Sequence, residues 1–116
     1  GVQWVQVDLK EKAKVHVIRL WHRHDAGRVY RDVVIQTAKD ADFIEDVKTL
    51  YNNDSDNSAG LGLGKDLEYL ESNQGKVLLL PKGVETRYVR FYSNGTHNSD
   101  MNHYTEVEIY GVPLKK

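Results

Sequence analysis

Alternation of apolar and polar residues constrains the fold of this chain more than any other feature, because it recurs along most of the sequence with the two-residue period of a strand. In "QWVQVDL", Val5, Val7 and Leu9 fall on one face of an extended chain. The segments 14–22 and 30–38 are apolar on both faces and rich in β-branched residues, which predicts interior strands. Further strand segments, bounded by turn formers, cover residues 47–52, 67–71, 76–80, 84–92 and 104–111. No window has the 3.6-residue period of an amphipathic helix. Seven or eight strands separated by turns predict a sandwich or barrel of antiparallel strands.

Length and charge exclude several classes of function. The 116 residues predict one domain, residues 1–116, with a single core. Sixteen basic and seventeen acidic residues give a net charge of −1, and the basic residues are spread along the chain, which argues against nucleic acid and anionic membranes as partners. No apolar run approaches the ~20 residues of a membrane span. Because cysteine is absent, any metal site must use oxygen or histidine ligands.

Three short motifs carry a family resemblance. They are "W-x-x-V-D-L" at residues 4–9, "R-Y-V-R" at 87–90 and "E-x-E-x-Y-G" at 106–111. With the strand order, they make the chain similar to the discoidin, or coagulation factor 5/8 type C, family, which includes bacterial galactose-binding-like carbohydrate-binding modules. The resemblance covers nearly the whole chain apart from the segment 52–69.

The resemblance implies an all-β fold, an antiparallel β-sandwich of the jelly-roll, galactose-binding-domain-like type. It also implies a binding module without catalytic machinery, whose loops at one end bind sugars, phospholipid head groups or proteins. In bacteria such modules are usually appended to secreted glycoside hydrolases or surface proteins, so we expect an extracellular, periplasmic or cell-surface location. The family's N-terminal segment has no counterpart here, and the chain is therefore expected to be a fragment of a longer multidomain protein.

Two loops hold the candidate ligand-binding residues. The first is "WHRHDAG", and the second is "SNGTHNSDMNHY". Loops at neighbouring strand ends of a jelly roll can meet, and their side chains offer hydroxyl partners and rings that stack on sugars. The predicted ligand-binding residues are His22, Arg23, His24, Asn94, His97, Asn98, His103 and Tyr104. The alternatives are a solvated loop with a turn at Asn94 and Gly95, or a transition-metal site that uses His22 and His24 with His97 or His103.

Calcium is the cofactor that the sequence suggests. By the resemblance, Glu106 matches a glutamate that binds a structural calcium ion in relatives. Asp54, Asp56 and Asp66 also suggest calcium, but the loop does not fit the helix-loop-helix calcium pattern. Counted from Asp54 as position 1, Ala59 stands where the pattern requires glycine and Lys65 stands where it requires the terminal glutamate. Another oxygen cage around Asn52, Asp54 and Asp56 stays open, although such stretches are more often soluble loops with Asx turns.

Catalysis has little support in the sequence. Glu106 and Glu108 occupy alternate positions of one strand, so they do not flank a scissile bond as an acid and a base do. "GLGLGKD" lacks the spacing of a phosphate-binding loop. Arg87 and Arg90 are interpreted as structural, at least one of them pairing with a carboxylate such as Asp8 or Glu108. The sequence thus favours a non-enzymatic carbohydrate-binding module; the alternative is a module that docks other domains of its parent protein without binding free sugar.

Overall fold

The fold comes from a computed structural model, which describes residues 3–22, 31–69, 75–95 and 104–114. Its strands are β1 (Gln3–His22), β2 (Val34–Ala38), β3 (Lys48–Asn52), β4 (Lys76–Ser93) and β5 (Tyr104–Pro113). They form one sheet in the order β3-β2-β4-β1-β5, and every pairing is antiparallel. The described residues include no helix, and so none long and apolar enough to cross a membrane.

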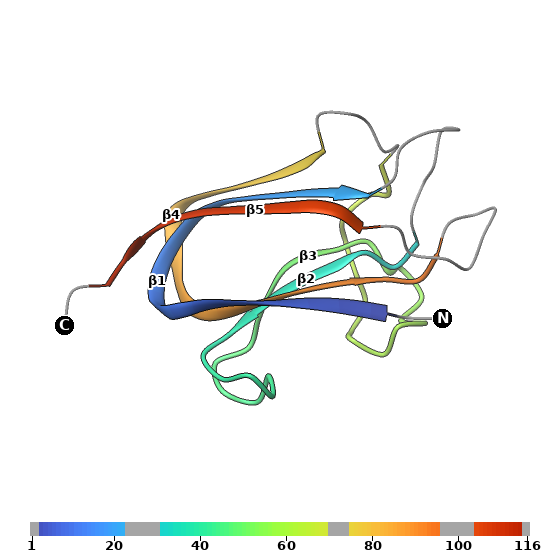
Figure 1. The fold of residues 1–116 in the computed structure, drawn as a ribbon. Helices are drawn as coiled ribbons and strands as arrows, with labels where there is room; N and C mark the ends of the chain where they lie inside the picture. Colours follow the sequence, from blue (N-terminus) through green and yellow to red (C-terminus); the bar gives the residue numbers. More distant parts are fainter. Residues whose placement is uncertain (1–2, 23–30, 70–74, 96–103, 115–116) are drawn as a thin grey trace.

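The sheet folds over on itself into two layers, which Figure 1 shows one above the other. The N-terminal half of β1 pairs with the C-terminal half of β4, from Gln3 with Ser93 to Asp8 with Tyr88. After the bend, the C-terminal half of β1 pairs with the N-terminal half of β4, and β5 lies on its other side. Strands β2 and β3 extend the first layer. The predicted antiparallel sandwich is confirmed.

The number of strands differs from the prediction because the two long strands turn a corner without ending. The register of β1 against β4 shifts between Asp8 and Ala13, and Lys10 in this stretch has a φ of 73°. On β4, Gly83 has a φ of 73°, which a residue with a Cβ rarely adopts. Bulges of this kind sharpen the twist and bend a strand. Turn signals at these corners therefore mark bends, and the segments predicted on either side belong to the same strand.

The core fills the space between the layers. Its buried residues come from the second half of β1, from β2 and the residue before it, from β3 and from the second half of β4, and are Val15, Ile18, Leu20, Val33, Ile35, Tyr51, Val89 and Phe91. Val7 and Leu9 pack against this cluster as the alternation predicts, whereas Val5 is 38% exposed. The predicted strand at 67–71 is wrong over its described part, since residues 67–69 have no strand pairing.

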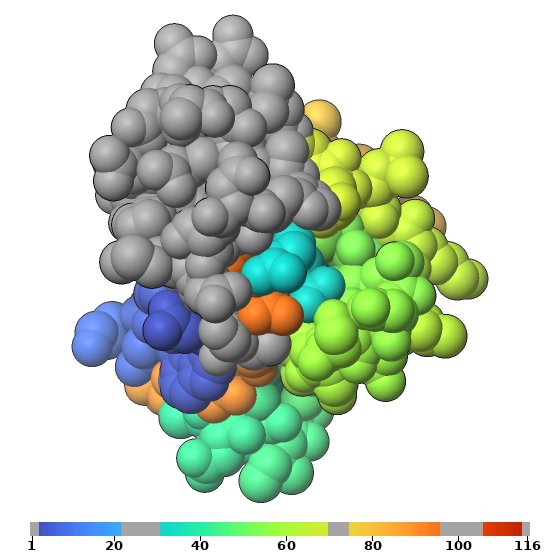
Figure 2. All heavy atoms as spheres, turned by 90° about the vertical axis from the view of Figure 1, so that its right-hand side faces the viewer, coloured from blue at the N-terminus to red at the C-terminus, as the bar shows by residue number. Residues whose placement is uncertain are grey.

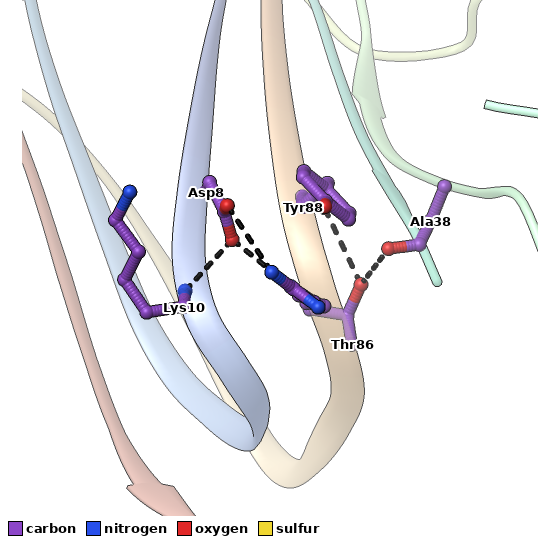
Figure 3. A network of polar contacts seen from close by, with 6 residues as sticks. Asp8, Lys10, Ala38, Thr86 and Tyr88 are labelled. Carbon is purple, nitrogen blue, oxygen red and sulfur yellow. Dashed lines mark hydrogen bonds and ion pairs between the residues drawn. The ribbon is translucent and has the colours of Figure 1, made fainter. Parts of the chain in front are cut away.

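Arg87 on β4 pairs with Asp8 on β1, as predicted for at least one of the two arginines. Arg87 Nε lies 3.1 Å from Asp8 Oδ1, and Asp8 also accepts the backbone N–H of Lys10 at 2.7 Å (Figure 3). The Arg87 hydrogen bond is the main reason that the pKa of Asp8 is lowered. Beside it, Thr86 Oγ1 donates to the carbonyl of Ala38 at 2.8 Å and so ties the end of β2 to β4.

Candidate functional site

The two loops predicted to bind a ligand begin and end side by side. Their central residues, including Arg23, His24, His97, Asn98 and His103, lie outside the described residues, as do the side chains of His22 and Tyr104. At one side of the loops, His22 and Tyr104 are paired in the sheet. At the other, the N–H of Arg31 donates to the carbonyl of Gly95, and the N–H of Asn94 to the carbonyl of Arg31, both at 2.8 Å. The chain therefore enters and leaves both loops at one end of the sandwich.

Asn94 is the predicted ligand-binding residue whose side chain the structure describes. Its Nδ2 donates to Asp32 Oδ2 at 2.8 Å, and its backbone carbonyl accepts Arg31 Nε at 3.1 Å. Gly95 follows with a φ of 69°, the left-handed conformation of a turn. The Asn94 amide thus fixes Asp32 between the two loops, and the ligand-binding roles of the other residues stay predictions.

A third segment, the loop after β3, reaches the same end of the sandwich. Figure 2 views this end: the segment after residue 30, the segment before residue 96 and the loop of residues 53–69 lie against one another there. Ser58 Oγ joins two of them by donating to Asp32 Oδ2 at 2.7 Å. The loop is anchored to the sheet through Asn53, whose N–H donates to the carbonyl of Val33 and whose Oδ1 accepts the N–H of Val33 at 2.6 Å.

Asp54 organises this loop from within. Its side chain is fully buried, with Oδ2 accepting the N–H of Ala59 at 2.8 Å and Oδ1 accepting the N–H of Ser58 at 3.1 Å. A second clamp closes the loop, because Asp66 Oδ2 accepts the N–H of Asn52 at 2.8 Å and the N–H of Asp66 donates back to the carbonyl of Asn52 at 3.0 Å. The Asx-rich segment is therefore an ordered loop with internal acceptors.

Three carboxylates gather where these segments meet. One oxygen from each of Asp32, Asp54 and Asp56 lies within 4.8 Å of the others. Burial, followed by hydrogen bonding to Asp56 and the charge of Asp32, raises the pKa of Asp54. The Ser58 hydroxyl lowers the pKa of Asp56. The group concentrates negative charge at this end of the sandwich.

The sequence foresaw part of this acidic group. Asp54 and Asp56 were singled out, but Asp66 lies in the loop clamp and is replaced in the group by Asp32, which is 22 residues before Asp54 in the chain. Asp32 has a φ of 52°, a left-handed conformation that Asp adopts more readily than most residues, but no sequence pattern predicts it here. Glu106 lies on β5 opposite Trp21, is exposed, and does not belong to this group of described carboxylates.

A cavity of about 290 Å³ opens beside the group. Its walls come from the three segments that meet at this end, and the lining residues are Arg31, Asp32, Asn53, Ser55, Asp56, Asp66, Leu67 and Glu68. Carboxylates, an amide, a hydroxyl and a guanidinium are the groups that bind polyhydroxylated ligands. We call this end, with the cavity and the bases of the two loops, the polar end.

A folded-over, antiparallel β-sandwich defines the class of fold as jelly-roll-like. The family is then shown directly: the model of the F5/8 type C domain matches residues 1–107, and the chain belongs to that family. The three motifs of the sequence therefore led to the right family. No curated protein matches the chain.

Solved structures support the fold. A variant of a family 89 glycoside hydrolase from Clostridium perfringens, in complex with its substrate GlcNAc-alpha-1,4-galactose, matches with a TM-score of 0.69 at 17% identity. The same values hold for the family 89 enzyme from that organism in complex with PUGNAc and with 2-acetamido-1,2-dideoxynojirmycin. In each case the match covers 95% of this chain and 10% of the other, so this chain spans a small part of those proteins.

Proposed function

We propose that this domain is a non-catalytic carbohydrate-binding module that binds glycan at the polar end. It belongs to a larger secreted or cell-surface protein and holds that protein on its glycan target. Support for the larger protein comes from the family 89 glycoside hydrolases, in which a domain of this fold occupies a tenth of the chain. The proposal assigns the ligand contacts to the two loops and the cavity beside them.

The observation that carries this proposal is the double pairing of the loop bases. His22 lies opposite Tyr104, and Arg31 is hydrogen bonded to Asn94 and Gly95. The shared bases of the two loops support the proposal that their residues bind a common ligand. Their residues combine donors, acceptors and aromatic rings, and sugars require both hydroxyl partners and a ring face.

Glycan-array screening followed by calorimetry on each hit tests the proposal. Arg23→Ala and Tyr104→Ala should each weaken binding by roughly 1–3 kcal/mol, the range for loss of a charged hydrogen bond or of its partner, with little change in melting temperature. Tyr110→Ala is the matched control, because Tyr110 is 53% exposed on the outer face of β5 and its hydroxyl donates to Glu108. No binding by the folded domain to any glycan, or parental affinity in both loop variants, would exclude this site.

Protein docking is the second candidate, and an apolar row on the outer face of the β4-β1-β5 layer favours it. Val17 lies opposite Leu79 on one side and Tyr110 on the other. Leu79 is 70% exposed, and a groove of about 340 Å³ continues from it along residues 79–84. If this face docks a neighbouring domain, Leu79→Lys should weaken that contact in the parent protein without changing glycan affinity. An unchanged contact would exclude docking through this row.

A further inference from the structure

The cavity at the polar end is strongly acidic. Its charged walls consist of Asp32, Asp56, Asp66 and Glu68 on the negative side and Arg31 on the positive side. Arg31 directs Nε to the carbonyl of Asn94. An acidic ligand that enters this cavity meets four carboxylates and one guanidinium, an arrangement that repels anions and attracts cations.

Within the described part of the chain, no lysine or arginine forms an ion pair with Asp32 or Asp56. Asp32 and Asp56 belong both to the cavity and to the acidic group. Their hydrogen-bond donors are neutral: the Asn94 amide and Ser58 hydroxyl for Asp32, and the Ser58 N–H for Asp56. The negative charge at this wall is therefore available to a cationic ligand.

The spacing of these carboxylates fits an ammonium group. The Asp32 and Asp56 oxygens in the group are no more than 4.8 Å apart. An ammonium nitrogen that donates to two oxygens at ~2.8 Å with tetrahedral angles places them ~4.6 Å apart. The upper limit on the Asp32–Asp56 spacing is thus compatible with one ammonium group that donates to both side chains.

Asn53 adds an independent sign of a ligand in the same cavity. It is only 6% exposed, it lines the cavity, and its Oδ1 is used by the N–H of Val33. Its Nδ2 is buried and has no hydrogen-bond partner among the described residues. A buried donor without an acceptor is uncommon in folded proteins, and a ligand hydroxyl oxygen supplies such an acceptor.

We propose that this cavity selects an amine-bearing sugar, a hexosamine unit whose free ammonium group lies between Asp32 and Asp56 and whose hydroxyl accepts from Asn53. Uronic acids are excluded from the cavity by the same carboxylates. The inference rests on the proposed function and deepens it, since it names the ligand class within glycans. Because N-acetylation removes the positive charge, the acetylated sugar loses the contact that defines the selection.

Isothermal titration calorimetry with three matched ligands tests the charge preference. The glucosamine disaccharide, its N-acetylated form and a disaccharide that contains glucuronic acid differ mainly in charge. The glucosamine disaccharide should bind about tenfold more tightly than the acetylated form, as expected for two charge-assisted hydrogen bonds to one group, and the acidic disaccharide should bind most weakly. The preference should fall as salt is raised, because the charges at the cavity mouth are screened.

Asparagine variants place the preference in the cavity. Asp56→Asn keeps an acceptor for Ser58 and removes one charge, and Asp32→Asn does the same at a positive φ that asparagine also tolerates. Each should lower the affinity for the glucosamine disaccharide about fivefold or more and leave the affinity for the acetylated form unchanged. Asp42→Asn, the same charge change at an exposed residue of the loop between β2 and β3, is the control and should change neither affinity. Two variants keep the test decisive if one of them fails to fold.

The outcomes separate this inference from the function beneath it. If the three disaccharides bind equally, or the acidic one binds best, the ligand class is wrong and the carbohydrate-binding function stands. If the glucosamine preference survives both Asp56→Asn and Asp32→Asn, the ammonium group lies elsewhere and the inference is overturned. If no glycan of any charge binds, the proposed function fails and this inference with it.

Discussion

Asp54→Ala is the substitution that tests most directly how the polar end is built. The Asp54 carboxylate is fully buried and lies at the centre of the loop after β3. Its removal takes acceptors from the N–H of Ala59 at 2.8 Å, the N–H of Ser58 at 3.1 Å and the Ser58 hydroxyl at 3.2 Å. The size of the stability loss depends on whether each of these donors has another acceptor.

Ser58 keeps other acceptors, whereas Ala59 does not keep a comparable one. The N–H of Ser58 also reaches Asp56 Oδ1 at 3.1 Å, and its hydroxyl also reaches Asp32 Oδ2 at 2.7 Å. One orphaned, partly buried donor costs about 1–3 kcal/mol, and the weakened Ser58 contacts add about 1 kcal/mol. Relief of repulsion among the carboxylates opposes part of this. We expect the free energy of unfolding to fall by about 2–3 kcal/mol and the melting temperature by roughly 8–12 °C.

Urea denaturation at neutral pH measures this loss, and Asp54→Asn with a pH series separates its charge from its hydrogen bonds. Burial raises the pKa of Asp54 in the folded state, so the protonated carboxyl favours the fold. This contribution to stability is fully present below the unfolded pKa near 3.8 and is lost as the pH rises through the raised folded pKa. Relative to Asp54→Asn, the wild type should therefore lose stability as the pH rises towards 7. An Asp54→Ala variant with the stability of the wild type would refute the role of this carboxylate as the organiser of the loop.

Three further substitutions address separate contacts. Gly64→Ala would place its Cβ 2.3 Å from the carbonyl oxygen of Asn52, so thermal melting should show a loss of about 1–3 kcal/mol, and an unchanged melting temperature would mean that the loop yields freely. Asp8→Asn should lower the stability, because the Arg87 contact stabilises the wild type above a pH near 3.8 and this contribution is lost as the pH falls through the lowered pKa of Asp8. Urea melts in low and high salt measure the difference, and a variant more stable than the wild type at neutral pH would contradict the prediction. Calcium should raise the melting temperature of a chain extended upstream, by about 2.7 kcal/mol of stability at 100 times Kd, and Glu106→Gln should abolish the rise; no rise in the extended wild type would remove this site.

Strand patterning predicted the layers well. Val89 and Phe91 are core residues on the same face of one strand, as alternation predicts, whereas the segments 14–22 and 30–38 are apolar on both faces and gave no inward face; all five residues of β2 are buried. Strand ends were harder to predict. Pro81 and Gly83 are turn formers, yet β4 continues through both and only bends, since a corner in a folded sheet and a hairpin turn use the same residues.

At the polar end, the sequence predicted which loops belong together but not how the third segment joins them. The pairing of strand ends follows from the order of elements in a jelly roll, and family resemblance supplied that order. The contact of Asp32 with Ser58 and with Asn94 links residues 26 and 62 positions apart. Such contacts depend on the path of irregular loops, for which the sequence has no periodic pattern, and the segment 52–69 also lies outside the family resemblance.

The path of the long strands explains why the loops gather at the polar end of the molecule. At the opposite end, β1 and β4 pass from one layer to the other as continuous strands, and the connection there is the loop of residues 39–47 between β2 and β3 (Figure 1). The connections β1 to β2, β3 to β4 and β4 to β5 must then leave from the polar end, where the chain departs from the sheet. Unpaired backbone in these connections needs polar side chains such as Asp54 and Asn94 to satisfy it, and the same side chains give the end its charge. The proposed selection of a cationic sugar therefore rests on the acceptors that hold the loops in place, while the fold alone determines only where the loops gather.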